Sequence, residues 1–136
     1  MRSEDGAGRD GEVRCVEIVF PDHCNHLGSL FGGQALAWMD KAAFLAASRF
    51  AGRTVVTARS DRIDFRAPVK LGDIVELRAN VVGVGRSSMT VRVSLLREPT
   101  PGAGRELATT GEFVMVAVDA QGRAVPVGRN LSHAMD

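Results

Sequence analysis

One segment of the chain has a strong helical pattern, and its composition restricts how the rest can fold. Residues 34–50, QALAWMDKAAFLAASRF, are rich in Ala, Leu and Met, which favour an α-helix. At 100° per residue, one stripe of this helix is formed by Leu36, Met39, Ala43, Ala47 and Phe50. Trp38, Ala42 and Leu45 lie near the opposite side. A helix that is apolar nearly all round should be wrapped by other structure.

One carboxylate falls inside the apolar stripe of this helix. Asp40 lies beside Leu36 and Ala43 on the helical projection, where a charge is out of place. Two interpretations are open. Asp40 is either a functional group or a structural carboxylate buried against Arg59 or Arg62.

The remaining segments read as strands. Residues 13–20 precede the helix, and four extended segments follow it: 54–65, 73–82, 88–96 and 106–118. The turns between the last four contain APVKLGD, GVGR and EPTPGAGR, which favour antiparallel hairpins. Alternation supports the strands, since one face collects Val75, Leu77, Ala79 and Val81. The predicted fold class is α+β, a sheet of about five antiparallel strands around one central helix.

Size and charge restrict the organisation and the partners. A chain of 136 residues fits one ordinary domain, which we place at residues 13–127, with a flexible lead-in at 1–12 and a tail at 128–136. The formal net charge of +1 gives no overall field for nucleic acid or an anionic membrane. No apolar run approaches the roughly 20 residues that span a bilayer.

The cysteines and the chain start indicate the compartment. Cys15 and Cys24 are too few for a disulfide framework. The first residues, MRSEDGAGRDGE, lack the apolar region of a secretion signal. We expect a soluble cytoplasmic protein with reduced thiols.

The stretch DHCNHLGSLFGG, residues 22–33, gathers groups that often carry chemistry. Zinc sites usually show two separated ligand pairs, and the only other histidine and cysteine are His133 and Cys15, so no metal is expected. A Cys24 nucleophile with a neighbouring histidine base lacks an orienting third group. The favoured interpretation is a polar loop before the helix, held by hydrogen bonds from Asp22 and Asn25.

A second glycine-rich stretch, GVGRSS at residues 83–88, superficially resembles a phosphate-binding loop. An alternating strand, MTVRVSLL, follows it where such a loop needs a helix. The stretch is therefore expected to be a hairpin turn, although its amides and Arg86 could contact a phosphate.

Three segments in order carry a family resemblance: NHLGSLFGGQALAWMDKAA, VVTARSDRIDFRAPVKLGDIVEL and GRSSMTVRV. Together they resemble the hotdog-fold acyl-CoA thioesterases, in the acyl-CoA hydrolase branch with bacterial short-chain and brain-type enzymes. The resemblance covers about residues 13–125. It implies a hydrolase that converts acyl-CoA to a free fatty acid and CoA, with no cofactor because CoA is part of the substrate. It also implies homodimers that join two sheets into one, further assembly into a trimer of dimers in some members, and active sites between protomers.

The resemblance assigns roles to several residues. Asp40 matches the catalytic carboxylate, as general base or nucleophile, and Gly33 matches the position at the helix N-terminus that stabilises the oxyanion. Asn25 and Ser29 join them, although relatives commonly carry Asn or Asp where this chain has the shorter Ser29. The CoA contacts are assigned to Arg62, Arg86, Ser87 and Ser88.

Helix geometry adds one constraint to these roles. Asp40 follows Gly33 by seven residues, which is roughly 10 Å along the helix at 1.5 Å per residue. Asp40 of one protomer is therefore poorly placed to serve its own helix start, and we expect it to serve the partner's.

Two other functional classes stay open on the same scaffold. One is a non-catalytic acyl-CoA-binding or sensor module. The other is a dehydratase, for which His26 is the candidate histidine, although it precedes the glycine pair by six residues.

Overall fold

The computed structural model describes residues 12–131, which contain one long helix, a short 3-10 turn and five strands. The elements follow the order β1 (Glu12–Ile18), η1 (Pro21–His23), α1 (Gly32–Ala51), β2 (Val55–Phe65), β3 (Ile74–Val84), β4 (Ser88–Glu98) and β5 (Glu106–Ala117). Residues 1–11 of the predicted lead-in and 132–136 of the predicted tail lie outside the described part.

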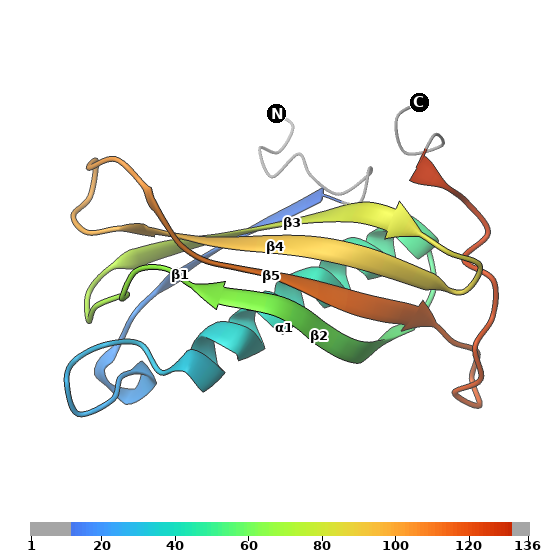
Figure 1. The fold of residues 1–136 in the computed structure, drawn as a ribbon, viewed down its shortest axis with the longest axis horizontal. Helices are drawn as coiled ribbons and strands as arrows, with labels where there is room; N and C mark the ends of the chain where they lie inside the picture. Colours follow the sequence, from blue (N-terminus) through green and yellow to red (C-terminus); the bar gives the residue numbers. More distant parts are fainter. Residues whose placement is uncertain (1–11, 132–136) are drawn as a thin grey trace.

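The five strands form one antiparallel sheet in the order β1-β3-β4-β5-β2 (Figure 1). Helix α1 crosses one face of this sheet, contacting every strand (Figure 1). The predicted α+β class and the hotdog fold are confirmed: one helix packs against five antiparallel strands.

The ends of the helix follow from local chemistry. It begins at Gly32, two residues before the predicted start, because the glycine pair already adopts helical geometry. It ends at Ala51 and is capped by Gly52, whose φ of +66° is left-handed and whose N–H donates to the Ser48 carbonyl at 2.8 Å. Glycine adopts this conformation at low cost, which makes it a common helix terminator.

The core lies between α1 and the sheet, and small side chains allow the two to approach closely. Four alanines of the helix, Ala42, Ala43, Ala46 and Ala47, are fully buried. Larger residues around them fill the space to the strands: Met39, Phe50, Leu77, Met89, Leu95 and Met115. The alternation predicted for β3 and β4 is confirmed, since the inward positions of both strands are buried.

The helix is less completely wrapped than its composition suggests. Ala37, Lys41 and Phe44 are exposed, and Asp40 is only partly buried. Asp40 meets the edge strand β2 through Thr57, and every residue of β2 except Val55 and Ile63 is exposed. The chain therefore leaves a helix face that includes Phe44 and the edge of the 11-residue strand β2 exposed.

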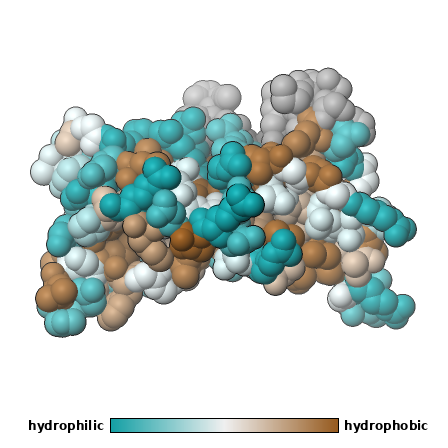
Figure 2. All heavy atoms as spheres, in the orientation of Figure 1, coloured by the Kyte–Doolittle hydropathy of each residue, from teal (hydrophilic) through white to brown (hydrophobic). Residues whose placement is uncertain are grey.

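The face of the sheet away from α1 carries paired charges. Glu112 lies 3.1 Å from Arg92 and 3.7 Å from Arg62, and Glu76 lies 2.9 Å from Arg105. Figure 2 shows hydrophilic side chains across the middle of the viewed surface, with hydrophobic areas on either side. Among the described residues, no helix has the length and hydropathy that crossing a bilayer requires.

The first residues of the predicted tail pack on the end of the helix, which the sequence pattern did not indicate. Arg129 places its guanidinium carbon 4.5 Å from the centre of the Phe50 ring, and its Nη1 donates to the Phe50 carbonyl at 3.3 Å. A cation at a helix C-terminus opposes the negative end of the helix dipole.

We expect Arg129→Leu to lower the free energy of unfolding by about 1–2 kcal/mol, because it removes a cation–π contact and a charged hydrogen bond. Chemical denaturation of the variant and the wild type measures this difference. Arg123→Leu, at an exposed position, is the control and should leave stability unchanged. Equal stability of Arg129→Leu and the wild type would contradict the capping role.

Candidate functional site

Asp40 and Thr57 form a hydrogen-bonded pair where the helix meets the edge strand. The Thr57 hydroxyl donates to Asp40 Oδ1 at 2.7 Å, joining α1 to β2. Both residues line an open cavity of about 330 Å³, together with Gly33, Leu36, Ala37, Ser60 and Phe113. The cavity therefore gathers a carboxylate, hydroxyl groups and the first turn of the helix.

Asp40 has no cationic partner among residues 12–131. Arg62, one of the two arginines considered as its structural partner, lies 3.7 Å from Glu112 instead, and Arg59 is exposed on β2. The described residues thus do not form the structural ion pair that the sequence left open. A neutral hydroxyl orients the carboxylate and leaves its second oxygen unused by any described residue.

The start of α1 is an open helix N-terminus. The N-cap residue is Phe31, which provides no side-chain acceptor, and the first turn has no acidic residue. The first intrahelical bond joins Ala35 N–H to the Phe31 carbonyl at 3.0 Å, so the amides of Gly32 and Gly33 have no partner within the helix. A Cβ built on Gly33 meets no described atom within 4 Å. The positive end of the helix dipole is accessible.

Asn25 organises the loop before the helix, which we call the pre-helix loop (residues 25–31). Its amide oxygen accepts from Leu27 N–H at 2.9 Å and Ser29 N–H at 3.1 Å. No described residue uses its amide NH2 group, which is left to donate elsewhere. Ser29 accepts a hydrogen bond from Lys70 Nζ at 3.2 Å. Asn25 thus holds the loop, as predicted, and also presents a donor.

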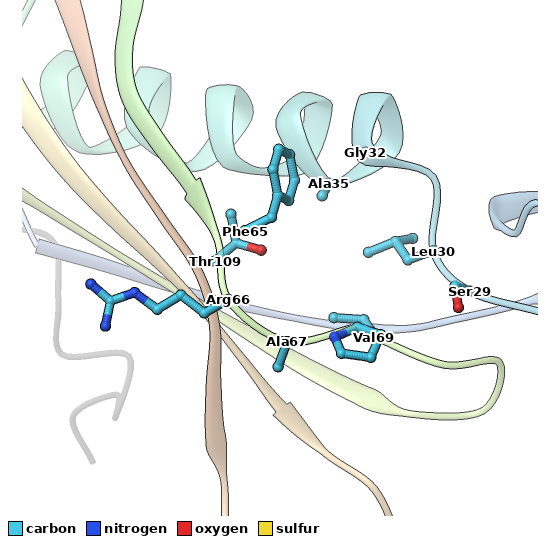
Figure 3. Close-up of a pocket in the computed structure, with 10 residues that line it drawn as sticks. Ser29, Leu30, Gly32, Ala35, Phe65, Arg66, Ala67, Val69 and Thr109 are labelled. Carbon is cyan, nitrogen blue, oxygen red and sulfur yellow. The ribbon is translucent and has the colours of Figure 1, made fainter.

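A larger cavity of about 420 Å³ lies on the other side of the helix start (Figure 3). Gly32, Ala35, Phe65 and Thr109 line one part, and Ser29, Leu30 and Val69 line another. In Figure 3 the Arg66 side chain extends away from the other lining side chains, and its Nε lies 3.0 Å from Asp64 Oδ2. The first turn of α1 therefore separates two cavities, and only the smaller one contains Asp40.

The histidines and the cysteine of the opening stretch have structural contacts. His23 Nδ1 accepts from Phe20 N–H at 3.0 Å, and its ring meets Trp38 edge-on with centroids 5.0 Å apart. Cys24 Sγ lies 3.5 Å from the Phe20 carbonyl, and His26 is exposed. Within residues 12–131 no group of three or more His, Cys, Asp or Glu side chains is arranged to hold a metal ion.

The Cys15 thiol is not activated. Burial on β1 raises its pKa above the ordinary value of 9.0, and the nearby Lys41 charge only partly opposes this effect. A thiol with a raised pKa is protonated at neutral pH and is a poor nucleophile.

The four residues assigned to CoA contacts lie in two places. Arg62 is on β2 with φ +56°, at a register shift between Asp61 and Asp64 in the pairing with β5. Arg86 and Ser87 lie in the β3–β4 turn and Ser88 begins β4, and the Arg86 carbonyl accepts from Val127 N–H at 2.8 Å. That turn lies at the opposite end of the sheet from Gly33, so one protomer does not bring it to its own helix start.

Thr57 is the site residue that sequence reasoning missed. It stands 17 residues from Asp40 in sequence, and no local motif marks it. Thr57 is two residues from the buried Val55 on β2, so the two side chains share the face toward the helix. This alternation is the one feature of the sequence that could have pointed to Thr57.

Comparisons with known proteins show which family the chain is similar to. A family model described as "Thioesterase superfamily" matches residues 27–103. The chain is 40% identical over 121 residues to the "Uncharacterized acyl-CoA thioester hydrolase YkhA" of Bacillus subtilis, which covers 89% of this chain and 70% of that protein.

Two solved structures are similar over most of the chain. A crystal structure of an apo-hexameric acyl-CoA thioesterase has 37% identity and a TM-score of 0.83, covering 88% of this chain and 77% of that one. An acyl-CoA hydrolase from Staphylococcus aureus, in complex with butyryl coenzyme A, coenzyme A and coenzyme A disulfide, has 34% identity and a TM-score of 0.81, covering 88% and 74%. Structures of the Staphylococcus aureus enzyme have also been solved for three variants, in which a threonine, an asparagine or an aspartate is replaced by alanine.

We expect Gly33→Ala to fold normally, with a free energy of unfolding equal to the wild type or up to about 1 kcal/mol higher. Alanine is the better helix former, and its methyl group meets no described atom at this position. Gly52→Ala is the matched control and should lose about 1 kcal/mol, because its backbone is left-handed. Thermal unfolding of the two variants checks this, and a marked loss for Gly33→Ala would show that the space is filled.

Proposed function

The chain belongs to the thioesterase superfamily, and on this basis we propose that it hydrolyses acyl-CoA thioesters to a free carboxylic acid and coenzyme A. The observation that carries the proposal is the cavity where Asp40, held by Thr57, lies on the same helix as an uncapped N-terminus. Thioester hydrolysis needs a base or nucleophile and a stabilised oxyanion, and these two features supply them.

Asp40 is the proposed base or nucleophile. As a base, its carboxylate takes a proton from water, whose oxygen bonds to the thioester carbon. The C–S bond then breaks, and the departing sulfur takes the proton to become the thiol. As a nucleophile, Asp40 attacks the thioester carbon, and the C–S bond breaks to release CoA as the thiolate and leave an anhydride. Water then cleaves the anhydride to the carboxylic acid and the free Asp40 carboxylate, and the proton released goes to the thiolate. The hydrogen bond from Thr57 leaves one carboxylate oxygen available in either route.

Gly33 is the proposed oxyanion donor. Its N–H lies in the first turn of α1, where backbone donors and the helix dipole favour the negative charge that develops on the carbonyl oxygen. No described side chain occupies the space above it. The methyl group of Gly33→Ala would enter this space, so we expect its turnover to fall although its fold is retained.

Asn25 and Ser29 complete the proposed site. The free NH2 group of Asn25 suits a carbonyl or a water, and Ser29 Oγ lies on the pre-helix loop beside it. The asparagine, aspartate and threonine replaced in the Staphylococcus aureus variants stand at the same sequence spacing as Asn25, Asp40 and Thr57. This correspondence supports the choice of these three positions.

The site is proposed to form between two copies of the chain. Gly33 and Asp40 are about 10 Å apart along one helix, which is too far for both to contact one thioester carbon. The unpaired edge of β2 and the exposed Phe44 and Val56 provide a surface for a second copy. In this arrangement, residues of one copy would contact the phosphates of the CoA that the other copy binds. These residues are Arg86 and Ser87 in the β3–β4 turn, Ser88 at the start of β4 and Arg62 on β2.

We expect Asp40→Asn to reduce turnover by roughly 10² or more, the scale of losing general-base catalysis. The amide keeps an oxygen for the Thr57 hydrogen bond, so the melting temperature should stay close to that of the wild type. A thiol-release assay over acyl chain lengths, paired with thermal unfolding, makes the measurement.

Cys24→Ser is the control for this experiment and should keep turnover within about tenfold, because the Cys24 thiol donates to the Phe20 carbonyl and packs against the core without a base beside it among the described residues. A well-folded Asp40→Asn variant that binds CoA and retains normal turnover would overturn the catalytic assignment and favour the binding-module alternative.

We expect the protein to be a dimer or a multiple of dimers at micromolar concentration, as light scattering would show. Val56→Lys places a charge on the open β2 edge and should weaken association and turnover together, because the site needs both copies. Val82→Lys, on β3 away from that edge, should keep at least the dimer. A fully active monomer would refute the shared site.

A further inference from the structure

The pre-helix loop (residues 25–31) is held in place by a second segment that is distant in sequence. Leu30 N–H donates to the Val69 carbonyl at 2.7 Å, and Leu71 N–H donates to the Gly28 carbonyl at 3.0 Å. Lys70 Nζ adds a contact to Ser29 Oγ at 3.2 Å. The loop therefore takes its position from the turn at residues 69–73, which we call the supporting turn.

The supporting turn is fixed at its last residue. Asp73 N–H donates to the Lys70 carbonyl at 3.0 Å, and Asp73 Oδ2 accepts from Lys70 N–H at 2.8 Å. Gly72 has φ +88°, a conformation that glycine adopts without strain, and its N–H donates to the Val19 carbonyl at 2.9 Å. Asp73 thus closes the turn through both its backbone and its side chain.

The Asp73 carboxylate forms an ion pair with Arg97 on the sheet. Arg97 on β4 brings its Nε to 2.6 Å from Asp73 Oδ2, and its Nη1 lies 3.0 Å from Glu106 on β5. The Asp73 and Arg97 side chains are only 5% and 17% exposed. The hydrogen bond to Asp73 raises the pKa of Arg97 above its ordinary value, so the guanidinium stays charged across the working pH range. A buried, directional ion pair therefore links β4 to the supporting turn.

We propose that Asp73 and Arg97 are positioning residues for the reaction: through the supporting turn, they set where Asn25 and the first amides of α1 lie relative to the thioester. The proposal rests on the proposed function of the site. Neither side chain is placed against the reacting atoms, and their effect is transmitted by the backbone bonds at Leu30 and Leu71. A displacement of about 1 Å in a positioned group can cost roughly 10² in rate.

A buried ion pair is a suitable device for fixing geometry, since it is a poor source of net stability. Desolvation of two charges offsets most of their attraction, and well-packed apolar side chains often replace such pairs without loss. The pair has a strict direction, however, and Arg97 meets Asp73 on the same oxygen that accepts from Lys70 N–H. A shift of that oxygen moves the supporting turn and the loop attached to it.

The chain offers a matched control on the same sheet. Glu76 on β3 is similarly buried and pairs with Arg105 at 2.9 Å and Arg78 at 3.2 Å. The hydrogen bonds described for this group do not reach the pre-helix loop. Glu76→Gln therefore removes a comparable charge pair without touching the supporting turn.

The test compares Asp73→Asn, Arg97→Gln and Glu76→Gln, with steady-state kinetics measured well below the melting temperature of each variant. We expect kcat to fall at least tenfold in the first two, with KM changed less than about threefold, and to stay within about twofold in Glu76→Gln. Arg97→Lys, which keeps the charge, should recover part of the loss. Hydrogen exchange at Leu30 and Leu71 should rise in Asp73→Asn and not in Glu76→Gln.

Normal kcat in Asp73→Asn, or an equal loss of kcat in Glu76→Gln, would overturn the positioning role. A wild-type protein without thioesterase turnover would instead refute the proposed function. In that case the exchange rates at Leu30 and Leu71 still decide whether the pair holds the loop, because that readout needs no substrate.

Discussion

The close packing of an alanine-rich helix face on the sheet is the contact on which the rest of the structure depends. Ala42, Ala43, Ala46 and Ala47 have no exposed surface, and larger buried side chains from both the helix, such as Met39 and Phe50, and the strands surround them. Small residues on the helix allow the two layers to approach, and larger side chains from both layers fill the remaining volume. This arrangement fixes the rotation of α1 about its own axis, and that rotation determines which residues it leaves uncovered.

The uncovered face of the helix carries the candidate site. Once the alanines face the sheet, Gly33, Ala37 and Asp40 are turned toward the edge strand β2, where Thr57 meets the carboxylate. The charges on the outer face of the sheet mostly pair with one another, whereas Asp40 receives a neutral hydroxyl. Within residues 12–131 the carboxylate is thus oriented by a hydroxyl and forms no ion pair, which suits a group that must accept a proton or attack a carbonyl.

The exposed edge of β2 is a surface for association and lies next to the candidate site. A strand edge of 11 residues beside a helix face with the exposed Phe44 favours pairing with another chain, and Asp40 lies on that face. Association and assembly of the site are therefore expected to be one event. The supporting turn holds the pre-helix loop through hydrogen bonds within one chain.

The sequence alone determined the elements, because their signals are local. Helical composition at residues 34–50, alternation on β3 and β4 and the turn residues predicted one helix and five antiparallel strands, and the order of quoted segments identified the family. The tertiary structure decided what depends on contacts distant in sequence. Thr57 joins Asp40, Arg129 caps the helix, and Asp73 pairs with Arg97, and in each case the partners are 17 to 79 residues apart. No periodicity in one strand or helix encodes such a contact, because it is set by strand register and by the rotation of α1 on the sheet, and both are fixed only when the whole core packs.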